Sequence, residues 1–321
     1  MRPHWKTLLR QNFTKWESLA DFLSFDALQR EQIVKRSSFP LNLPFRLAGK
    51  IEKGTLEDPI LKQFLPILEE EKKVDGYVKN PLQEENFQIT PKLLKKYGAR
   101  ALILSTSACA MHCRYCFRRH FPYETKDRDF SKELEYLKTN AEIEEVILSG
   151  GDPLSLDDKV LQSLLQELGS IKHIKLIRFH TRFPIGIPER VDDAFLALLS
   201  SSKKQIIFVL HTNHAKELDI AVLQACKRIV RLGIPVLTQS LLLKGVNDAV
   251  STLKELCMTL ACNAIIPYYL HQLDPVEGGA HFLVPKEEGI KLIKELKTML
   301  PGYAVFRYVT EIPGEKSKLE I

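Results

Sequence analysis

The chain has 321 residues, of which 45% are hydrophobic and 27% are charged. This length fits one large α/β domain or two domains of ordinary size, and no apolar run is long enough to span a bilayer. Residues 1–13 are basic but lack the apolar stretch of a secretory signal, so we expect a cytoplasmic protein. The formal net charge is +6, yet Lys and Arg are mixed with Asp and Glu along the chain, which argues against a nucleic-acid or membrane partner.

Residues 1–95 are predicted to form an N-terminal helical region. Helical patterns cover residues 16–23, 27–36 and 58–73, and a connector containing Pro and Asn follows over residues 77–91. We expect this region to pack on the domain that follows it.

Short apolar runs typical of β-strands alternate with amphipathic helical patterns over residues 96–300. The strand-like runs are residues 101–106, 145–151, 174–181, 205–211, 234–240 and 263–270. The helical patterns between them cover residues 132–140, 158–168, 191–199, 221–232 and 250–260. This alternation predicts a parallel sheet of βα units, either an open doubly wound sheet or a partial barrel. Residues 301–321 are predicted to add one more strand, over residues 303–309, and a C-terminal tail.

Three of the six cysteines fall within eight residues, directly after the first predicted strand. Cys109, Cys113 and Cys116 have the spacing C-x3-C-x2-C, and in a reducing compartment such a cluster indicates a metal site and not a disulfide framework. Three thiolates can bind three irons of a cubane cluster and leave the fourth iron open. The alternative is a zinc site closed by His112 or His120 as the fourth ligand, but the three-cysteine spacing favours iron–sulfur.

A second motif, ILSGGDPL, ends the second predicted strand. Gly150 and Gly151 allow a close approach of the backbone, and Asp152 fixes a turn. Alone, this motif would be read as an ordinary turn. Both motifs fall at the carboxyl ends of strands, where barrel enzymes place their active sites, so we favour a partial (βα)6 barrel over an open sheet.

The C-x3-C-x2-C run resembles the signature of radical S-adenosylmethionine enzymes. The resemblance implies a TIM-like partial barrel and a 4Fe–4S cluster on the three cysteines, whose open iron binds S-adenosylmethionine. Cleavage of that cofactor would give a 5′-deoxyadenosyl radical. The residues implied to contact S-adenosylmethionine are Tyr115, against the adenine, and Ser149, Gly150, Gly151 and Asp152 in the glycine-rich turn.

Longer motifs narrow the resemblance to the lysine 2,3-aminomutases, and most to the short bacterial branch that makes (R)-β-lysine for elongation factor P. These motifs are CRYCFRRHFPY, SGGDPL, QSLLLKGVND, PYYLHQLDPVEGGAHF and PGEKSK. The resemblance implies a second cofactor, pyridoxal 5′-phosphate, bound as a Schiff base to Lys318, with Lys316 as the alternative. Without the resemblance, a lysine so near the C-terminus would be read as part of a solvated tail.

The resemblance also assigns the groups around this cofactor and the substrate. Tyr97, Arg100 and Arg118 are placed near the phosphate of pyridoxal phosphate, and the substrate carboxylate is an alternative partner for Arg118. Asp274 matches an aspartate that neutralises the ε-ammonium of lysine. Glu311 stands at the second carboxylate position, where the longer catabolic aminomutases have Asp, so the charge is kept while the reach changes.

The implied function is conversion of L-lysine to β-lysine by a 5′-deoxyadenosyl radical and pyridoxal phosphate, with an electron from a reductant of flavodoxin or ferredoxin type. The product would reach elongation factor P through a ligase. Two alternatives stay open. One is another amino-acid 2,3-aminomutase, such as a glutamate enzyme, whose acidic substrate Asp274 and Glu311 would repel. The other is a non-catalytic zinc-binding module.

Overall fold

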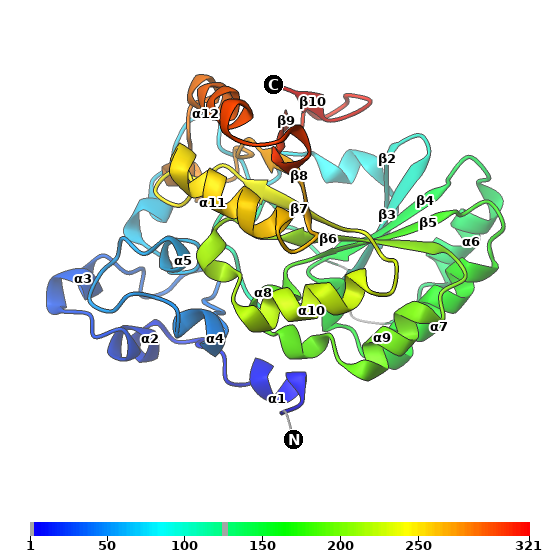
Figure 1. Cartoon of the computed structure of the whole chain (residues 1–321), viewed down its shortest axis with the longest axis horizontal. Coiled ribbons are helices and arrows are strands. Elements are labelled where there is room, and N and C mark those ends of the chain that lie inside the picture. Colours follow the sequence, from blue (N-terminus) through cyan, green and yellow to red (C-terminus); the bar gives the residue numbers. More distant parts are fainter. Residues whose placement is uncertain (1–2, 124–127) are drawn as a thin grey trace.

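A ten-stranded sheet lies at the centre of the computed structural model, which describes residues 3–123 and 128–321 (Figure 1). The order of the strands in the sheet follows their order in the chain, from β1 to β10. Strands β3 to β9 run parallel, and each is hydrogen-bonded to the next. They are β3 (Arg100–Thr106), β4 (Glu145–Gly150), β5 (Leu176–Thr181), β6 (Gln205–His211), β7 (Val236–Leu241), β8 (Ile266–His271) and β9 (Arg307–Thr310).

The six strands predicted from apolar runs are confirmed as β3 to β8, and the strand predicted after residue 301 is confirmed as β9. Side chains alternate between the two faces of each strand. In β5, Ile177 and Phe179 are buried in the core, whereas Arg178 and His180 line the interior cavity. The parallel strands therefore carry polar groups on the face that the cavity uses.

Crossover helices cover the outer face of the sheet, because parallel neighbours can only be joined by a connection that crosses back. Aspartates cap two of them: Asp192 accepts from the N–H of Phe195 and Asp219 from that of Val222, each at 2.9 Å. The helices are α6 (Ser131–Thr139), α7 (Asp158–Ser170), α9 (Asp193–Ser200), α10 (Ile220–Val230), α11 (Val250–Ala261) and α12 (Lys286–Met299). The five helices predicted between strands are confirmed, and α12 is a further helix that the sequence analysis does not predict.

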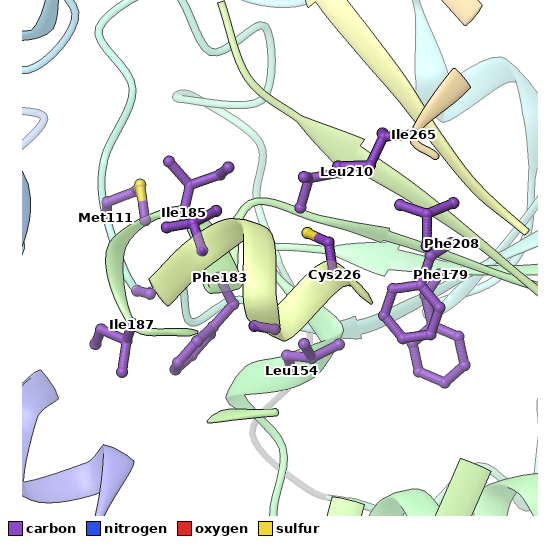
Figure 2. Close-up of a cluster of buried hydrophobic side chains, with 14 of the residues drawn as sticks. Met111, Leu154, Phe179, Phe183, Ile185, Ile187, Phe208, Leu210, Cys226 and Ile265 are labelled. Carbon is purple, nitrogen blue, oxygen red and sulfur yellow. The ribbon is translucent and has the colours of Figure 1, made fainter. Parts of the chain in front are cut away.

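Aromatic and aliphatic side chains fill the layer between the sheet and its helices (Figure 2). The rings of Phe179 and Phe208 stack with centroids 5.0 Å apart, and Phe195 of α9 meets Phe208 edge-on at 6.2 Å. Full burial of one such side chain contributes about 1.5–3 kcal/mol. The same core includes Leu19 and Phe64 of the N-terminal region, both fully buried, so this region packs directly on the barrel.

The N-terminal region consists of short helices, and two of the predicted helices are wrong in extent. The pattern over residues 27–36 is helical only to Glu31, after which Ile33 forms a β-bridge with Ile67. The pattern over residues 58–73 breaks at Lys62, because the ring of Pro66 clashes with the carbonyl four residues earlier in a helix. The elements are α1 (Trp5–Leu9), α2 (Trp16–Phe22), α3 (Ala27–Glu31), α4 (Phe45–Ala48), α5 (Pro59–Lys62) and the 3-10 helix η1 (Leu68–Glu71).

Short antiparallel strands extend both edges of the parallel sheet. The strands β1 (Gln88–Thr90) and β2 (Leu93–Tyr97) precede β3, and β10 (Leu319–Glu320) pairs with β9. Lys96 of β2 forms an ion pair with Glu311, which follows β9, so the two ends of the sheet approach each other. The sheet is therefore curved into a partial barrel, as predicted, and is not an open sheet.

Several one-turn segments complete the connections between these elements. They are η2 (Glu84–Phe87), η3 (Pro153–Ser155), α8 (Phe183–Gly186), η4 (Pro188–Arg190), η5 (Ala215–Glu217), η6 (Ala280–Phe282) and η7 (Gly302–Ala304). Among the helices of residues 3–123 and 128–321, none combines the length and the hydrophobicity that a membrane-spanning segment needs.

Candidate active site

A cavity of about 390 Å³ opens at the carboxyl ends of the parallel strands, and all the predicted site residues are among those that line it. Parallel strands direct the residues after them to the same end of a barrel, which explains how positions far apart in sequence meet here. Lys316, the alternative to Lys318, is exposed and does not line the cavity. The predicted residues that line it are Tyr97, Arg100, Cys109, Cys113, Tyr115, Cys116, Arg118, Ser149, Gly150, Gly151, Asp152, Asp274, Glu311 and Lys318.

The three clustered cysteines are free thiols in the loop after β3. Burial and the charges of Asp152 and the other two thiols raise the pKa of Cys109 well above its ordinary value. Burial and the charge of Cys113 raise the pKa of Cys116 to about 11. Each thiol disfavours the ionisation of its neighbours, and bound iron would take the place of their protons.

These residues fit an iron–sulfur cluster. In the described part of the chain, no three His, Cys, Asp or Glu side chains converge as ligands of one metal ion would. A cubane cluster does not need that convergence, because each thiolate binds a different iron atom. Three thiols that line one cavity without converging on a single point therefore suit the cluster that the motif predicts.

The glycine-rich turn after β4 lies directly against the cysteine loop. A Cβ added at Gly150 would lie 2.6 Å from the carbonyl oxygen of Thr106. One added at Gly151 would lie 2.4 Å from the carbonyl oxygen of Ala108. Gly150 also has a φ of +111°, which side chains rarely adopt. Only glycine permits this approach, so a side chain at either position would push the turn away from the cysteine loop.

Asp152 joins the ends of β4 and β5. Its carboxylate accepts hydrogen bonds from the hydroxyl of Thr181 at 2.7 Å and from the backbone N–H groups of Arg182 and Phe183 at 2.7 and 2.9 Å. Burial raises its pKa to about 6 although these donors favour the charged form. The carboxylate is thus used to hold the turn in shape.

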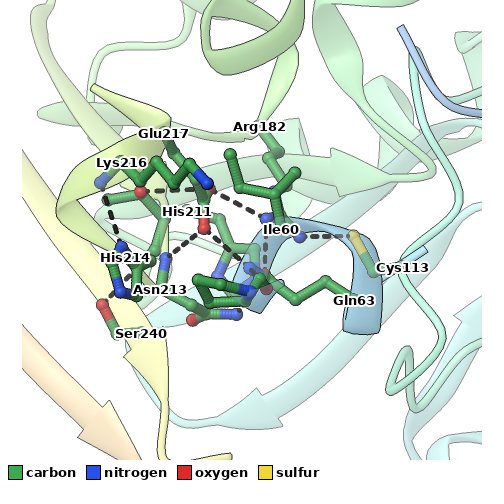
Figure 3. A network of polar contacts seen from close by, with 12 residues as sticks. Ile60, Gln63, Cys113, Arg182, His211, Asn213, His214, Lys216, Glu217 and Ser240 are labelled. Atoms are coloured by element: carbon green, nitrogen blue, oxygen red, sulfur yellow. Dashed lines mark hydrogen bonds and ion pairs between the residues drawn. The ribbon is translucent and has the colours of Figure 1, made fainter. Parts of the chain in front are cut away.

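A buried polar network contacts the cysteine loop at Cys113 (Figure 3). Arg182 donates to the sulfur of Cys113 at 2.9 Å, to Gln63 at 2.7 Å and to Glu217 at 2.9 Å. Burial opposes the charge of Arg182, but Cys113, Tyr115 and Glu217 raise its pKa above the ordinary value. The guanidinium therefore stays charged beside a predicted cluster ligand. The sequence analysis does not predict this role for Arg182, although its place at the carboxyl end of a barrel strand is a signal for a site residue.

Tyr115 is fixed by the same network. Its hydroxyl accepts from Asn213 at 2.7 Å, contacts His211 at 2.8 Å and donates to Gln63 at 3.2 Å. Burial lowers the pKa of His211 to about 3, so its imidazole is neutral. The ring of Tyr115 lines the cavity in a single orientation, and its contact with an adenine stays a prediction.

Charged side chains also cluster around Lys318. Both Lys318 and Lys96 form ion pairs with Glu311, one with each carboxylate oxygen. Burial opposes the charge of Glu311, but the two lysines lower its pKa to about 2. Lys96 is a cavity residue that the sequence analysis does not single out.

Asp274 is a second buried carboxylate that lines the same cavity. Within the described residues its carboxylate has no ion-pair partner. Burial, and then repulsion from Glu311, raise its pKa to about 7. Near Lys318, Glu311 is therefore an ionised carboxylate that is already paired, and Asp274 is a carboxylate that can gain a cation.

Arg100 and Arg118, the two arginines predicted to bind the cofactor phosphate or the substrate carboxylate, differ in whether a carboxylate of the protein already occupies them. The guanidinium of Arg100 stacks on the ring of Tyr97 at 4.6 Å. Arg118 forms a bidentate pair with Glu84, with both N–O distances at 2.7 Å, and donates to Ser149 at 3.2 Å. The sequence analysis does not identify Glu84, because it lies 34 residues from its partner. Any anion held by Arg118 must share the guanidinium with this carboxylate.

The chain is similar to known proteins over nearly its whole length. It is 41% identical over 323 residues to the L-lysine 2,3-aminomutase of Escherichia coli (strain K12), with 99% of this chain and 94% of that protein covered. It is 39% identical over 319 residues to the L-lysine 2,3-aminomutase of Haemophilus influenzae, with 98% and 94% covered. Identity to the Clostridium subterminale L-lysine 2,3-aminomutase is 30% over 324 residues, with 99% and 77% covered.

Two further comparisons agree with the fold. Residues 103–257 match the Radical SAM superfamily. The structure resembles that of a radical SAM methyltransferase from Sphaerobacter thermophilus with a TM-score of 0.51 and 16% identity, over 68% of each chain, which supports the fold alone. With the cysteine loop, the glycine-rich turn and the barrel in place, the chain belongs to the L-lysine 2,3-aminomutase family of the Radical SAM superfamily.

Proposed function

We propose that this chain converts L-lysine to β-lysine by moving an amino group between neighbouring carbons. The observation that carries the proposal is that three cysteine thiols, Lys318 and Asp274 line the same cavity. The first set suits a radical-generating cluster, and the second suits a covalently held cofactor beside a cation-binding carboxylate. Similarity over nearly the full length to relatives named L-lysine 2,3-aminomutase supports lysine as the substrate.

Each cofactor has a set of residues that would hold it. Bound together, the cluster and S-adenosylmethionine supply a radical that removes hydrogen, and pyridoxal phosphate supplies a π-system for the migrating nitrogen. The three cysteines would bind the cluster, and Tyr115 and the turn at residues 149–152 would bind S-adenosylmethionine. Lys318 would attach pyridoxal phosphate through its amine. Tyr97, Arg100 and Arg118 would face its phosphate, or in the case of Arg118 the substrate carboxylate.

Charge would select lysine over other amino acids. Asp274 has no ion-pair partner among the described residues, because the nearby Lys318 and Lys96 both pair with Glu311, and a lysine substrate brings an ammonium group to it. An ammonium group buried without a partner costs several kcal/mol, so the carboxylate distinguishes lysine from neutral amino acids. A glutamate substrate would add a third carboxylate beside Asp274 and Glu311, which disfavours the glutamate alternative.

The test is anaerobic reconstitution with iron, sulfide, S-adenosylmethionine and pyridoxal phosphate, followed by chiral chromatography of the product from L-lysine. We expect β-lysine, in the R form. Lys318→Ala should abolish both the product and the visible absorption of bound pyridoxal phosphate. Lys316→Ala, a change at an exposed lysine two positions away, should preserve both. A reconstituted enzyme that binds both cofactors and leaves lysine unchanged would refute the proposal.

We further propose that the electron comes from a flavodoxin- or ferredoxin-type reductant and that the product reaches elongation factor P through a ligase. The first idea follows from the radical S-adenosylmethionine motif, because its cluster must be reduced, and the second rests on the motifs shared with the short bacterial branch of the family. Mass spectrometry of elongation factor P from cells with and without the gene for this chain tests the second idea. An unchanged mass would exclude it.

A further inference from the structure

The loop that carries the cysteines is held in shape by the N-terminal region. The side chain of Asn42 donates to the carbonyl of Cys109 at 3.2 Å, and that of Asn12 donates to the carbonyl of Ala110 at 2.7 Å. The backbone N–H of His112 donates to the carbonyl of Asn42 at 3.0 Å. The loop's conformation therefore depends on residues from outside the barrel.

Two arginines of this loop converge on one carboxylate, that of Glu70 in η1. Arg114 donates from Nε to one oxygen at 2.7 Å and from Nη2 to the other, which also accepts from Nη2 of Arg119 at 2.8 Å. The side chains of Arg114, Arg119 and Glu70 are only 0%, 5% and 4% exposed. Solvent cannot screen charges buried to this degree, so Glu70 is the neutralising partner of both guanidinium groups.

These charges lie beside the cluster ligands. Arg114 stands between Cys113 and Cys116 in the sequence, and Arg119 is close enough to Cys116 for their charges to interact. The two guanidinium groups and the carboxylate together carry a single net positive charge next to the cysteine thiols. Nearby net charge is one of the factors that set the reduction potential of an iron–sulfur cluster. Removal of the carboxylate would double that net charge without touching any cysteine.

The geometry points to Glu70 as a positioning residue of the cluster site, which we propose fixes the loop through Arg114 and Arg119 and offsets part of their charge. Glu70 would not contact iron or substrate. Its effect would reach the cluster through the two arginines. In other metal sites, groups that contact the ligands and not the metal tune metal affinity in this way. This inference requires the cluster but not lysine as the substrate.

Glu70→Gln is the most direct test, because it keeps the size of the side chain and removes its charge. We expect it to lower cluster affinity about tenfold or more, read as iron retained after anaerobic reconstitution and desalting. The midpoint potential of the cluster that remains should shift in the positive direction. Glu71→Gln, which makes the same chemical change at an exposed neighbour in η1, should leave iron content and potential at wild-type values.

A double variant separates charge compensation from simple structural support. Glu70→Gln combined with Arg119→Gln returns the loop to one net positive charge, so iron content and potential should move back toward wild type. Wild-type iron content and potential in Glu70→Gln alone would overturn the proposal. So would a loss of iron that accompanies a lower melting temperature of the cluster-free chain and that the double variant fails to reverse. None of these readouts uses turnover of lysine, so they stand even if the proposed substrate is wrong.

Discussion

The ionisation of Asp274 should control the use of lysine between pH 5.5 and 8.5. Burial and the neighbouring charge of Glu311 raise the pKa of Asp274 to about 7. The ε-ammonium of lysine keeps its proton throughout this range, because its ordinary pKa is about 10.4. Only the ionised carboxylate can pair with that ammonium. Lysine should therefore be captured poorly on the acid side of neutrality and well on the alkaline side.

The size of the effect follows from that pKa. With a pKa of about 7, about one carboxylate in ten is ionised at pH 6, and about nine in ten at pH 8. The value of kcat/KM for lysine reports ionisations of the free enzyme, so it should fall about tenfold for each pH unit below 7 and level off above 8. At saturating cofactor concentrations, this fall in kcat/KM should appear as a rise in the KM for lysine.

The assay is a pH series of initial rates under anaerobic conditions, with the absorption of bound pyridoxal phosphate recorded at each pH as a control for cofactor loss. Asp274→Asn should give a low kcat/KM without the acid limb. Glu311→Gln should move the limb to lower pH, because it removes the negative charge that helps to raise the pKa of Asp274. A wild-type profile that is flat between pH 5.5 and 8, or an acid limb that persists in Asp274→Asn, would refute this reasoning.

Three further changes test other parts of the structure. Gly151→Ala puts a Cβ 2.4 Å from a carbonyl oxygen of the cysteine loop, so S-adenosylmethionine binding should weaken at least about tenfold in equilibrium dialysis while iron is still bound. Phe208→Ala should lower the free energy of unfolding by about 3–5 kcal/mol in urea titrations, whereas Tyr303→Ala, at a side chain 75% exposed, should change it by less than about 0.5 kcal/mol. Arg182→Met leaves the fully buried carboxylate of Glu217 without its cation, which should cost about 3–5 kcal/mol in the same titrations.

The barrel was predictable because its signals are local. Six strand-like runs become β3 to β8, because short apolar runs that alternate with amphipathic helical patterns are visible among neighbouring residues. The N-terminal helices were harder, because Pro66 divides one predicted helix and Ile33 leaves another to pair with Ile67. The strands β1 and β2 are short, and the pattern over three to five residues does not distinguish a strand from a connector.

The candidate site was predictable at positions where a motif fixes the chemistry. The spacing of the cysteines and the adjacent glycines are recognisable sequence patterns, and they mark the loops after β3 and β4. The ion pairs of Glu70 and Glu311 have no such pattern in the sequence. Glu70 and Arg114 are 44 residues apart, and Lys96 and Glu311 are 215 residues apart. Only the folded barrel shows which of many possible charge pairs forms, so their partners could not be read from the sequence.

The pairing of two lysines with Glu311 has a consequence for cofactor attachment. Lys318 must leave its ion pair with Glu311 when its amine is attached to pyridoxal phosphate. A buried carboxylate left without a cation costs several kcal/mol, but Lys96 remains on the other oxygen of Glu311 and keeps it neutralised. Glu311 therefore stays ionised, and its charge continues to raise the pKa of Asp274. On this argument Asp274 is the main carboxylate for the substrate ammonium, and Glu311 acts on the substrate chiefly through its effect on Asp274.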